Sequence, residues 1–197
     1  MKIIMTVLGL VGMLWTTSVS EAERELLNIS KTESSVGWKA AKVTGEHWGK
    51  VSISDAKLDY ENGRIQGGSF EINMTTITVE DIKDANSNKR LVDHLKSDDF
   101  FSVEKFNKSS MTITEAKTSN GKDYEIKANL IIKGISNPVT FPVTVSEEGN
   151  KVIATGKITF DRTKYDIKYR SGNYFENLAD RLIYDEVTLD VKLVGMK

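Results

Sequence analysis

The sequence predicts an all-β protein, an eight-stranded antiparallel barrel with one or two short helices covering its ends. Eight segments alternate apolar and polar residues, and most of them are joined by short turns. Strands with a single apolar face exclude a doubly wound parallel sheet, whose strands are apolar on both faces. Three consecutive tight hairpin connections favour a meander that closes into a barrel over a sandwich. An eight-stranded barrel has an interior that can hold one small ligand.

The composition fits one domain with a sizeable core. The chain has 197 residues and a formal net charge of −1, with acidic and basic residues interspersed. This balance gives no electrostatic basis for binding nucleic acid or an anionic membrane surface. The chain has no cysteine, which excludes disulfides, thiol catalysis, cysteine zinc sites and lipid attachment through an N-terminal cysteine.

The N-terminal segment predicts export. Lys2 precedes an apolar run over residues 3–15, which is shorter than the roughly 20 residues that span a bilayer. Small residues at alternate positions predict cleavage after Ser20 or Ala22, and the alternative is an uncleaved anchor helix. The expected division is a signal peptide over 1–22 and a barrel domain over 23–197. The mature chain would be periplasmic or secreted, without a membrane span.

The strands follow one another with recognisable turns between them. Asn62-Gly63 is a type I′ hairpin signal, and Ser119-Asn120-Gly121-Lys122 predicts another turn. The apolar phase slips near Ser54-Asp55 and across Gly67-Gly68, which predicts a bulge in each of two long, bent strands. The expected strands are residues 34–41, 50–60, 64–76, 109–117, 123–133, 138–146, 151–161 and 183–194.

Two segments have helical character. Residues 78–96 end in the apolar stripe Leu91, Val92 and Leu95, and polar turn formers at 97–99 end the helix. The aromatic residues that follow, Phe100 and Phe101 among them, need a surface to cover, and the end of the barrel provides one. Residues 171–182 predict a second short helix. It has a capping-box spacing at Asn173 and Glu176, and an apolar stripe that includes Phe175 and Leu178.

The sequence gives little support for catalysis. His47 and His94 are the two histidines, no G-x-S-x-G elbow occurs, and neither histidine has a partner at a zinc-site spacing. His94 stands four residues before Asp98, but a histidine bonded to the loop at a helix end explains this spacing more simply than chelation. We therefore expect no catalytic residue, no cofactor and no metal site.

Arg162 has three possible environments. It shares the phase of Ile158 and Phe160, so a regular strand would point it inward, where an unpaired charge is costly. It could meet an acid such as Asp99 at the barrel rim, contact the polar end of a ligand, or turn to solvent at a bulge beside Asp161.

The remaining candidates are apolar residues that could line a cavity. Several inward positions, such as Ala40, Ala128 and Gly156, are small and leave room inside the barrel. The candidate cavity residues are Trp38, Trp48, Phe70, Ile72, Met74, Phe101, Leu130, Ile132, Phe141, Ile158, Phe160 and Phe175.

Five motifs in order carry a family resemblance. They are Gly45-x-His47-x-Gly49, residues 94–106, residues 130–143, residues 161–169 and Asp185-Glu186-Val187. Together they resemble the YceI-like family over essentially the whole mature chain. The resemblance implies a lipocalin-like barrel in the periplasm that binds a long apolar molecule, such as a polyisoprenoid or fatty amide. It implies no catalytic residues.

These observations lead to a carrier or sequestering protein for a long-chain apolar ligand of the isoprenoid, quinone or fatty amide class. The head group would sit at the barrel mouth near Arg162, His94 or His47, and a homodimer is possible. One alternative is an enzyme acting on a lipid or quinone head group with His47 or His94 as acid or base. Another is a fully packed structural or stress-response barrel that binds no ligand.

Overall fold

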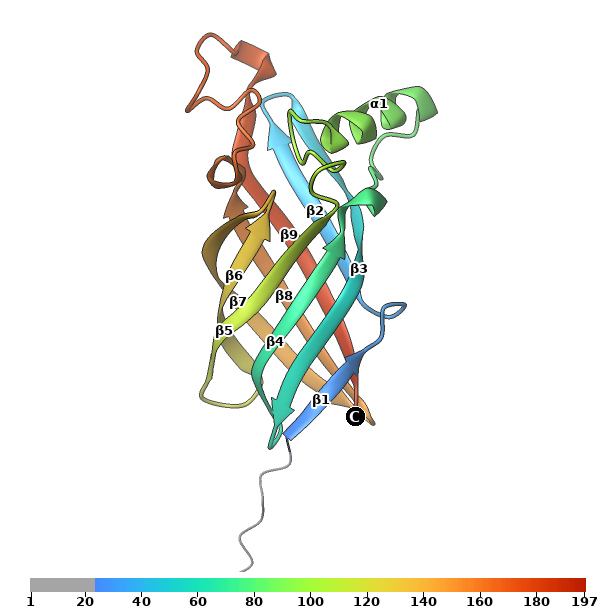
Figure 1. Ribbon diagram of the computed structural model, residues 1–197, viewed down its shortest axis with the longest axis vertical. Helices are drawn as coiled ribbons and strands as arrows, with labels where there is room; N and C mark the ends of the chain where they lie inside the picture. The colour runs from blue at the N-terminus through green and yellow to red at the C-terminus, as the bar shows by residue number, and fades with distance from the viewer. Residues whose placement is uncertain (1–23) are drawn as a thin grey trace, which may run out of the picture.

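The computed structural model describes residues 24–197 as a closed antiparallel β-barrel with one α-helix (Figure 1). The predicted signal peptide lies outside the described residues. The strands are β1 (Arg24–Ile29), β2 (Ser35–Lys42), β3 (Gly45–Glu61), β4 (Arg64–Asn73), β5 (Lys108–Thr118), β6 (Asp123–Ile132), β7 (Ile135–Glu148), β8 (Lys151–Asp161) and β9 (Ile183–Met196). The helix is α1 (Ala85–Lys96), and short 3₁₀ turns cover Met74–Thr76, Arg162–Tyr165 and Ala179–Arg181.

The described strands fill eight positions around the barrel because β1 and β2 share one. β2 pairs with the first half of β3, as in Val36 opposite Val51, and β1 pairs with the second half, as in Leu27 opposite Leu58. Both also pair with β9, and the β3–β4 pair closes the barrel. The predicted eight-stranded barrel is confirmed. The additional strand is β1, which precedes the first of the eight predicted strands.

The predicted turn and bulges of the β3–β4 hairpin are confirmed. Asn62 and Gly63 both have positive φ, 50° and 74°, as a type I′ turn requires. The register of β3 against β4 shifts between Ile53 and Asp55 and again next to Gly67. The extra residues bend both strands, which helps the sheet curve back on itself.

The helix begins at Ala85, so the predicted start at residue 78 is wrong. Residues 77–84, which we call the strap, follow the free edge of β3 instead: Thr78 N–H donates to Lys50 O and Glu80 N–H donates to Trp48 O. A Cβ at Gly49 would lie 1.9 Å from Thr78 O, so only glycine allows this close approach. Asp84 then caps the helix by accepting from Ser87 N–H at 2.8 Å.

The predicted helix over 171–182 is wrong. Only the 3₁₀ turn Ala179–Arg181 forms there. Arg170, Asn177 and Ala179 have positive φ, which interrupts an α-helix. The Asn173 side chain, predicted to cap a helix, donates to Asp185 Oδ2 at 2.7 Å instead. This segment is therefore a loop that folds back onto β9.

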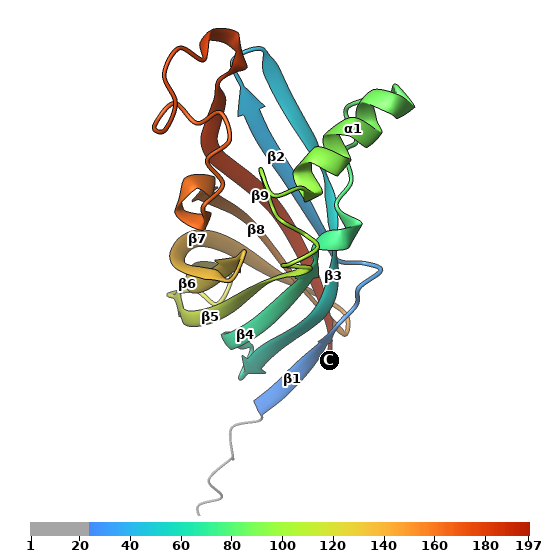
Figure 2. The ribbon, with the colours of Figure 1, turned by 45° about the horizontal axis from the view of Figure 1, so that its top comes forward.

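The core consists of two clusters stacked along the barrel axis. The lower one includes Leu27, Leu58 and Tyr60, near β1 in Figure 1. Its end is closed in part by the Tyr60 hydroxyl, which donates to Glu147 Oε1 at 2.6 Å, while Lys197 pairs with the same carboxylate. The upper cluster packs against α1. Figure 2, with the top turned forward, shows α1 and the loop before β9 on either side of that end.

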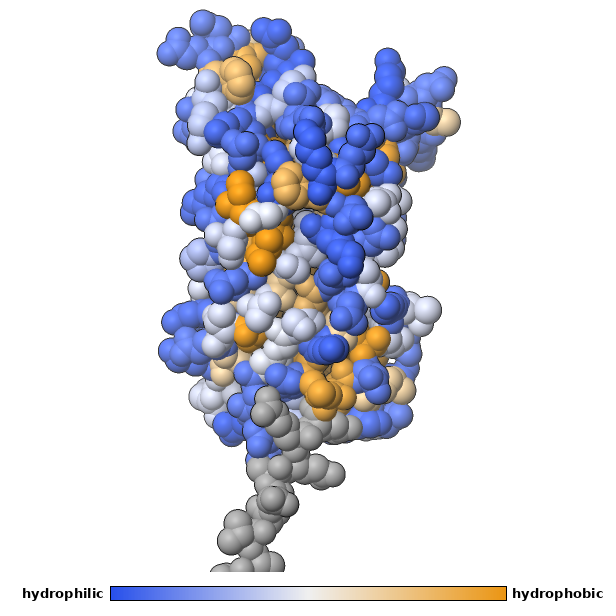
Figure 3. All heavy atoms as spheres, viewed as in Figure 1, coloured by the Kyte–Doolittle hydropathy of each residue, from blue (hydrophilic) through white to orange (hydrophobic). Residues whose placement is uncertain are grey.

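The outer surface is mainly polar on the face shown in Figure 3, with hydrophobic residues in small groups. No helix in the described part of the chain is long and apolar enough to cross a bilayer.

Candidate ligand cavity

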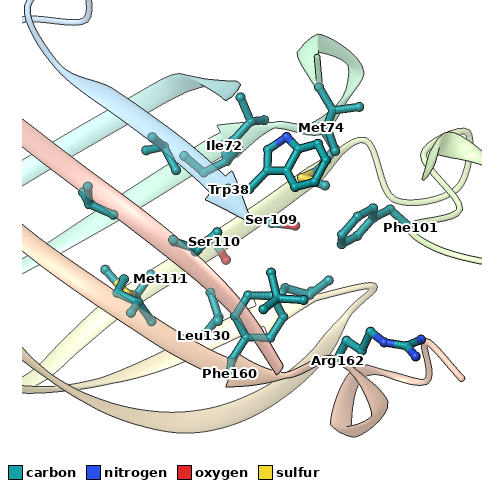
Figure 4. Close-up of a pocket in the computed structure, with 18 of the residues that line it drawn as sticks. Trp38, Ile72, Met74, Phe101, Ser109, Ser110, Met111, Leu130, Phe160 and Arg162 are labelled. Atoms are coloured by element: carbon teal, nitrogen blue, oxygen red, sulfur yellow. The ribbon is translucent and has the colours of Figure 1, made fainter. Parts of the chain in front are cut away.

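A cavity of about 140 Å³ lies in the upper half of the barrel, beneath α1 and the loop that follows it (Figure 4). Its lining is contributed by inward-facing residues of the strands and by Leu95, Phe100 and Ile167 at the upper end. Nine of the predicted cavity residues border it: Trp38, Phe70, Ile72, Met74, Phe101, Leu130, Ile132, Ile158 and Phe160. The barrel is thus not fully packed, and the space inside it is apolar.

A smaller cavity of about 40 Å³ lies deeper in the barrel, and the predicted residue Phe141 borders this one. The two cavities share Phe70, Met111 and Ile158 in their linings, together with Val191 and Leu193. These shared side chains separate the upper cavity from the lower one. Because methionine is unbranched and adaptable, movement of Met111 offers a route for joining the two spaces.

Trp48 and Phe175 do not border either cavity, so their placement was predicted wrongly. Trp48 is 44% exposed and sits opposite Lys39 on the outer face of β3, while Trp38 fills the inner position. Phe175 is 50% exposed because its segment is a surface loop and not a helix packed on the barrel.

Arg162 borders the cavity but directs its charge away from it, as Figure 4 shows. Nε donates to Tyr184 O, Nη1 to Ile167 O and Tyr169 O, and Nη2 to Ile183 O, at 2.9–3.1 Å. Nη2 also lies 3.0 Å from Asp185 Oδ1. Four of these contacts are hydrogen bonds to backbone carbonyls, and the fifth is an ion pair with Asp185. Of the three predicted environments, pairing with an acid is correct, although the acid is Asp185 and not Asp99.

His94 lies at the upper rim and does not border the cavity. Its ring packs edge-on against Phe100 and Tyr169, with centroid distances of 4.9 and 4.7 Å. Its Nε2 lies 2.9 Å from Asp99 Oδ2 in the loop after α1. The favoured interpretation of a histidine bonded to the loop at a helix end is confirmed. The contact with Tyr169 also links α1 to the segment that follows β8.

His47 holds the strap and lies outside the cavity. Its Nδ1 is 2.7 Å from Asp81 Oδ2, and the other oxygen of Asp81 accepts from Trp48 N–H at 3.1 Å. Burial on its own would raise the pKa of Asp81, but the hydrogen bonds from His47 and Trp48 N–H lower it more. The net result is a pKa below the ordinary value of 3.8.

The strap contact predicts a pH dependence of stability. A carboxyl group with a lowered pKa stabilises the fold above its unfolded pKa, and this contribution disappears as the pH falls through the folded pKa. Replacing Asp81 with Asn should therefore lower the free energy of unfolding at pH 7 and change it much less at pH 2.5. Urea unfolding at both pH values measures this. The exposed Asp93→Asn is the control, and an equal loss for Asp81→Asn at both pH values would contradict the prediction.

The described residues include no cluster of three or more histidine, cysteine, aspartate or glutamate side chains that could hold a metal. What the cavity offers chemically is exclusion of water and a hydrophobic lining.

Some of the cavity lining was not among the predicted residues, notably Leu95 and Phe100, which close the upper end. Their signal was the apolar helical stripe and the aromatic pair, which indicated a cover for the barrel but not a contact with its interior.

Comparison with known proteins agrees with this architecture. The family model described as the YceI-like domain matches residues 27–195. A "UPF0312 protein" of Shewanella denitrificans is 29% identical over 101 residues, 51% of this chain and 50% of that protein. One of Shewanella oneidensis is 25% identical over 127 residues, 61% and 64% of the two chains. The chain thus spans about half the length of the first of these curated relatives.

Solved structures share the fold at low sequence identity. Burkholderia cenocepacia BcnA superposes with a TM-score of 0.69 and 19% identity, covering 85% of this chain and 99% of that one. A polyisoprenoid binding domain from Saccharophagus degradans gives a TM-score of 0.61 and 10% identity, covering 85% and 96%. With the family model matching nearly all of the described residues, the chain belongs to the YceI-like family.

Proposed function

We propose that this protein holds a long-chain apolar molecule, such as a polyisoprenoid or another lipid tail, inside its barrel as a carrier, store or sequestering protein. The observation that carries the proposal is the cavity of about 140 Å³ lined by aliphatic and aromatic side chains. The fold shared with the polyisoprenoid binding domain of Saccharophagus degradans supports it.

Burial of the chain supplies the binding free energy. Each methylene removed from water contributes about 0.8 kcal/mol, so about ten methylenes give strong binding before ordering costs are subtracted. A cavity of about 140 Å³ is close in size to one that holds a benzene molecule. The unliganded space therefore holds one end of a chain. A longer chain extends downward by displacing the side chains between the two cavities, Met111 among them.

The ligand enters from the upper end in this proposal. The lower end is occupied by Tyr60, Glu147 and Lys197, whereas α1 and the loop before β9 flank the upper end. The tail would therefore lie deepest and the polar head highest. Each of the three predicted head-group residues is already paired, Arg162 with Asp185, His47 with Asp81 and His94 with Asp99, and of the three His94 lies at the upper rim.

The proposal includes export, with release of the mature chain after Ser20 or Ala22. Acid or base catalysis by a histidine gains no support, because neither imidazole borders the cavity among the described residues.

The proposal is tested by native mass spectrometry of the full-length gene product expressed in a Gram-negative host and purified from the periplasm. We expect a stoichiometric adduct that solvent extraction recovers as an apolar long-chain compound, on a chain that has lost its first 20 or 22 residues. A single ligand-free mass, under conditions in which a known lipocalin retains its ligand, would contradict the carrier function. Recovery only in the cytoplasm would contradict export alone.

A further inference from the structure

The cavity wall contains a serine hydroxyl without a hydrogen-bond partner among the described residues, and it lies on the inward face of β5. Ser109 is the second residue of β5, is 8% exposed and borders the cavity, where Figure 4 shows it among apolar side chains. Its neighbour across the β4–β5 pair is Ile72. Within residues 24–197, no group forms a hydrogen bond with Ser109 Oγ. Ser109 Oγ is open to the cavity and is not among the fully buried unpaired atoms of the described residues, so its bonding capacity is available to a molecule in that space.

Two other polar residues that border the cavity, Trp38 and Arg162, are already paired, whereas the neighbouring Ser110 also borders it and lies in the opposite phase of β5 from Met111. Trp38 Nε1 donates to Thr78 O at 3.0 Å, and Arg162 uses its donors on backbone carbonyls and Asp185. The hydroxyl of Tyr165 is also buried and unpartnered in the described part of the chain, but Tyr165 does not border the cavity. Of the two serines, Ser109 is the more buried and shares the inward phase of Met111, so its hydroxyl is the one best placed to face the ligand space.

We propose that Ser109 determines ligand specificity by hydrogen bonding to a neutral polar group of the bound molecule, such as a carbonyl, amide or hydroxyl. This inference rests on the proposed function and adds the class of head group. The position of Ser109 at the upper start of β5 agrees with a tail that lies deeper, past Met111. A carboxylate or phosphate at this depth would lose its hydration without gaining a counter-charge, because the guanidinium of Arg162 is committed.

The hydrogen bond is tested with three small probes that suit a cavity of this size. Ethylbenzene and acetophenone differ by a carbonyl oxygen in place of two hydrogens, and benzoate carries a charge in the same shape. Dissociation constants are measured by NMR titration of the ligand-free protein. Ser109→Ala should reduce the affinity for acetophenone relative to ethylbenzene by about three- to ten-fold, the range of one net hydrogen bond. Benzoate should bind far more weakly than either neutral probe.

Matched variants make the test specific. Ser110→Ala removes the same atom from the next residue, which also borders the cavity but lies in the opposite phase of β5, and so identifies which of the two serines makes the contact. Thr112→Ala removes a hydroxyl from the exposed face of the same strand and should leave the ratio unchanged. Tyr165→Phe should also leave it unchanged, and Ser109→Thr, which keeps a hydroxyl, should retain it.

The possible results separate the two proposals. An unchanged ratio in Ser109→Ala, with both neutral probes still bound, would overturn the role of Ser109 and leave the cavity function intact. Loss of selectivity in Ser110→Ala or Tyr165→Phe instead would assign the contact to that residue and also overturn it. If ethylbenzene does not bind the wild-type protein, the proposed function fails, and the role of Ser109 fails with it.

Discussion

Replacing Arg162 with methionine is expected to lower the free energy of unfolding by about 3–5 kcal/mol, the range for breaking a buried ion pair by removing one partner. Arg162 is 3% exposed and connects three stretches of chain through its contacts with Ile167, Tyr169 and the Ile183–Asp185 segment. Methionine fills a similar volume but donates no hydrogen bond. The carbonyl oxygens and the carboxylate of Asp185 would then remain partly buried without this partner.

We do not expect a lysine at position 162 to fulfil the structural role of the arginine. An ammonium group has three donors at one point, whereas the guanidinium here donates to four separate carbonyls and forms an ion pair with a carboxylate. We expect Arg162→Lys to lose most of the stability that Arg162→Met loses. Adding Asp185→Asn to Arg162→Met should recover part of the loss, because it removes the unpaired charge.

Urea unfolding at pH 7, followed by tryptophan fluorescence and circular dichroism, measures these differences. Arg181→Met is the matched control, since Arg181 is exposed and lies in the same loop. A loss below about 1 kcal/mol for Arg162→Met, which is the range of surface pairs, would show that the network contributes little.

The strand pattern was predictable because it depends on local alternation. Each predicted strand is present, and the Asn62-Gly63 turn is formed. Both features were predictable because residues adjacent in the sequence determine a two-residue apolar period and a glycine turn. The start of α1 was not predictable in this way. Residues 78–84 have no local signal that they pair with β3, and this pairing depends on the glycine at Gly49, far earlier in the chain.

In the candidate site, too, local sequence patterns predicted some features, whereas others depend on residues far apart in the chain. Strand phase identified Phe160 and Ile132 as inward. The partner of Arg162 could not be found from phase, because Asp185 becomes a neighbour only when β8 and β9 pair, with Asp161 opposite Glu186. The cavity volume could not be predicted either, since it is the small space left after all inward side chains have packed.

The largest functional effect is expected from a charge placed in the cavity wall. Phe160→Asp and Ile132→Asp each introduce a carboxylate at a buried position that borders the cavity. A buried carboxylate without a partner costs several kcal/mol, and every 1.4 kcal/mol is a factor of ten in affinity. Each variant should lose more than roughly 100-fold in affinity for a long-chain ligand. It should therefore leave the periplasm without the adduct seen for the wild-type protein in native mass spectrometry.

Thr159→Asp is the matched control, because Thr159 precedes Phe160 on β8 and is exposed, so ligand retention should be unchanged. Near-ultraviolet circular dichroism identifies any variant that has unfolded.

A second variant introduces no charge. Val191→Phe places a larger side chain between the two cavities, which should shorten the space for a tail while the barrel remains folded. Wild-type retention in a folded Phe160→Asp protein, together with full retention in Val191→Phe, would show that the ligand binds elsewhere than the barrel interior.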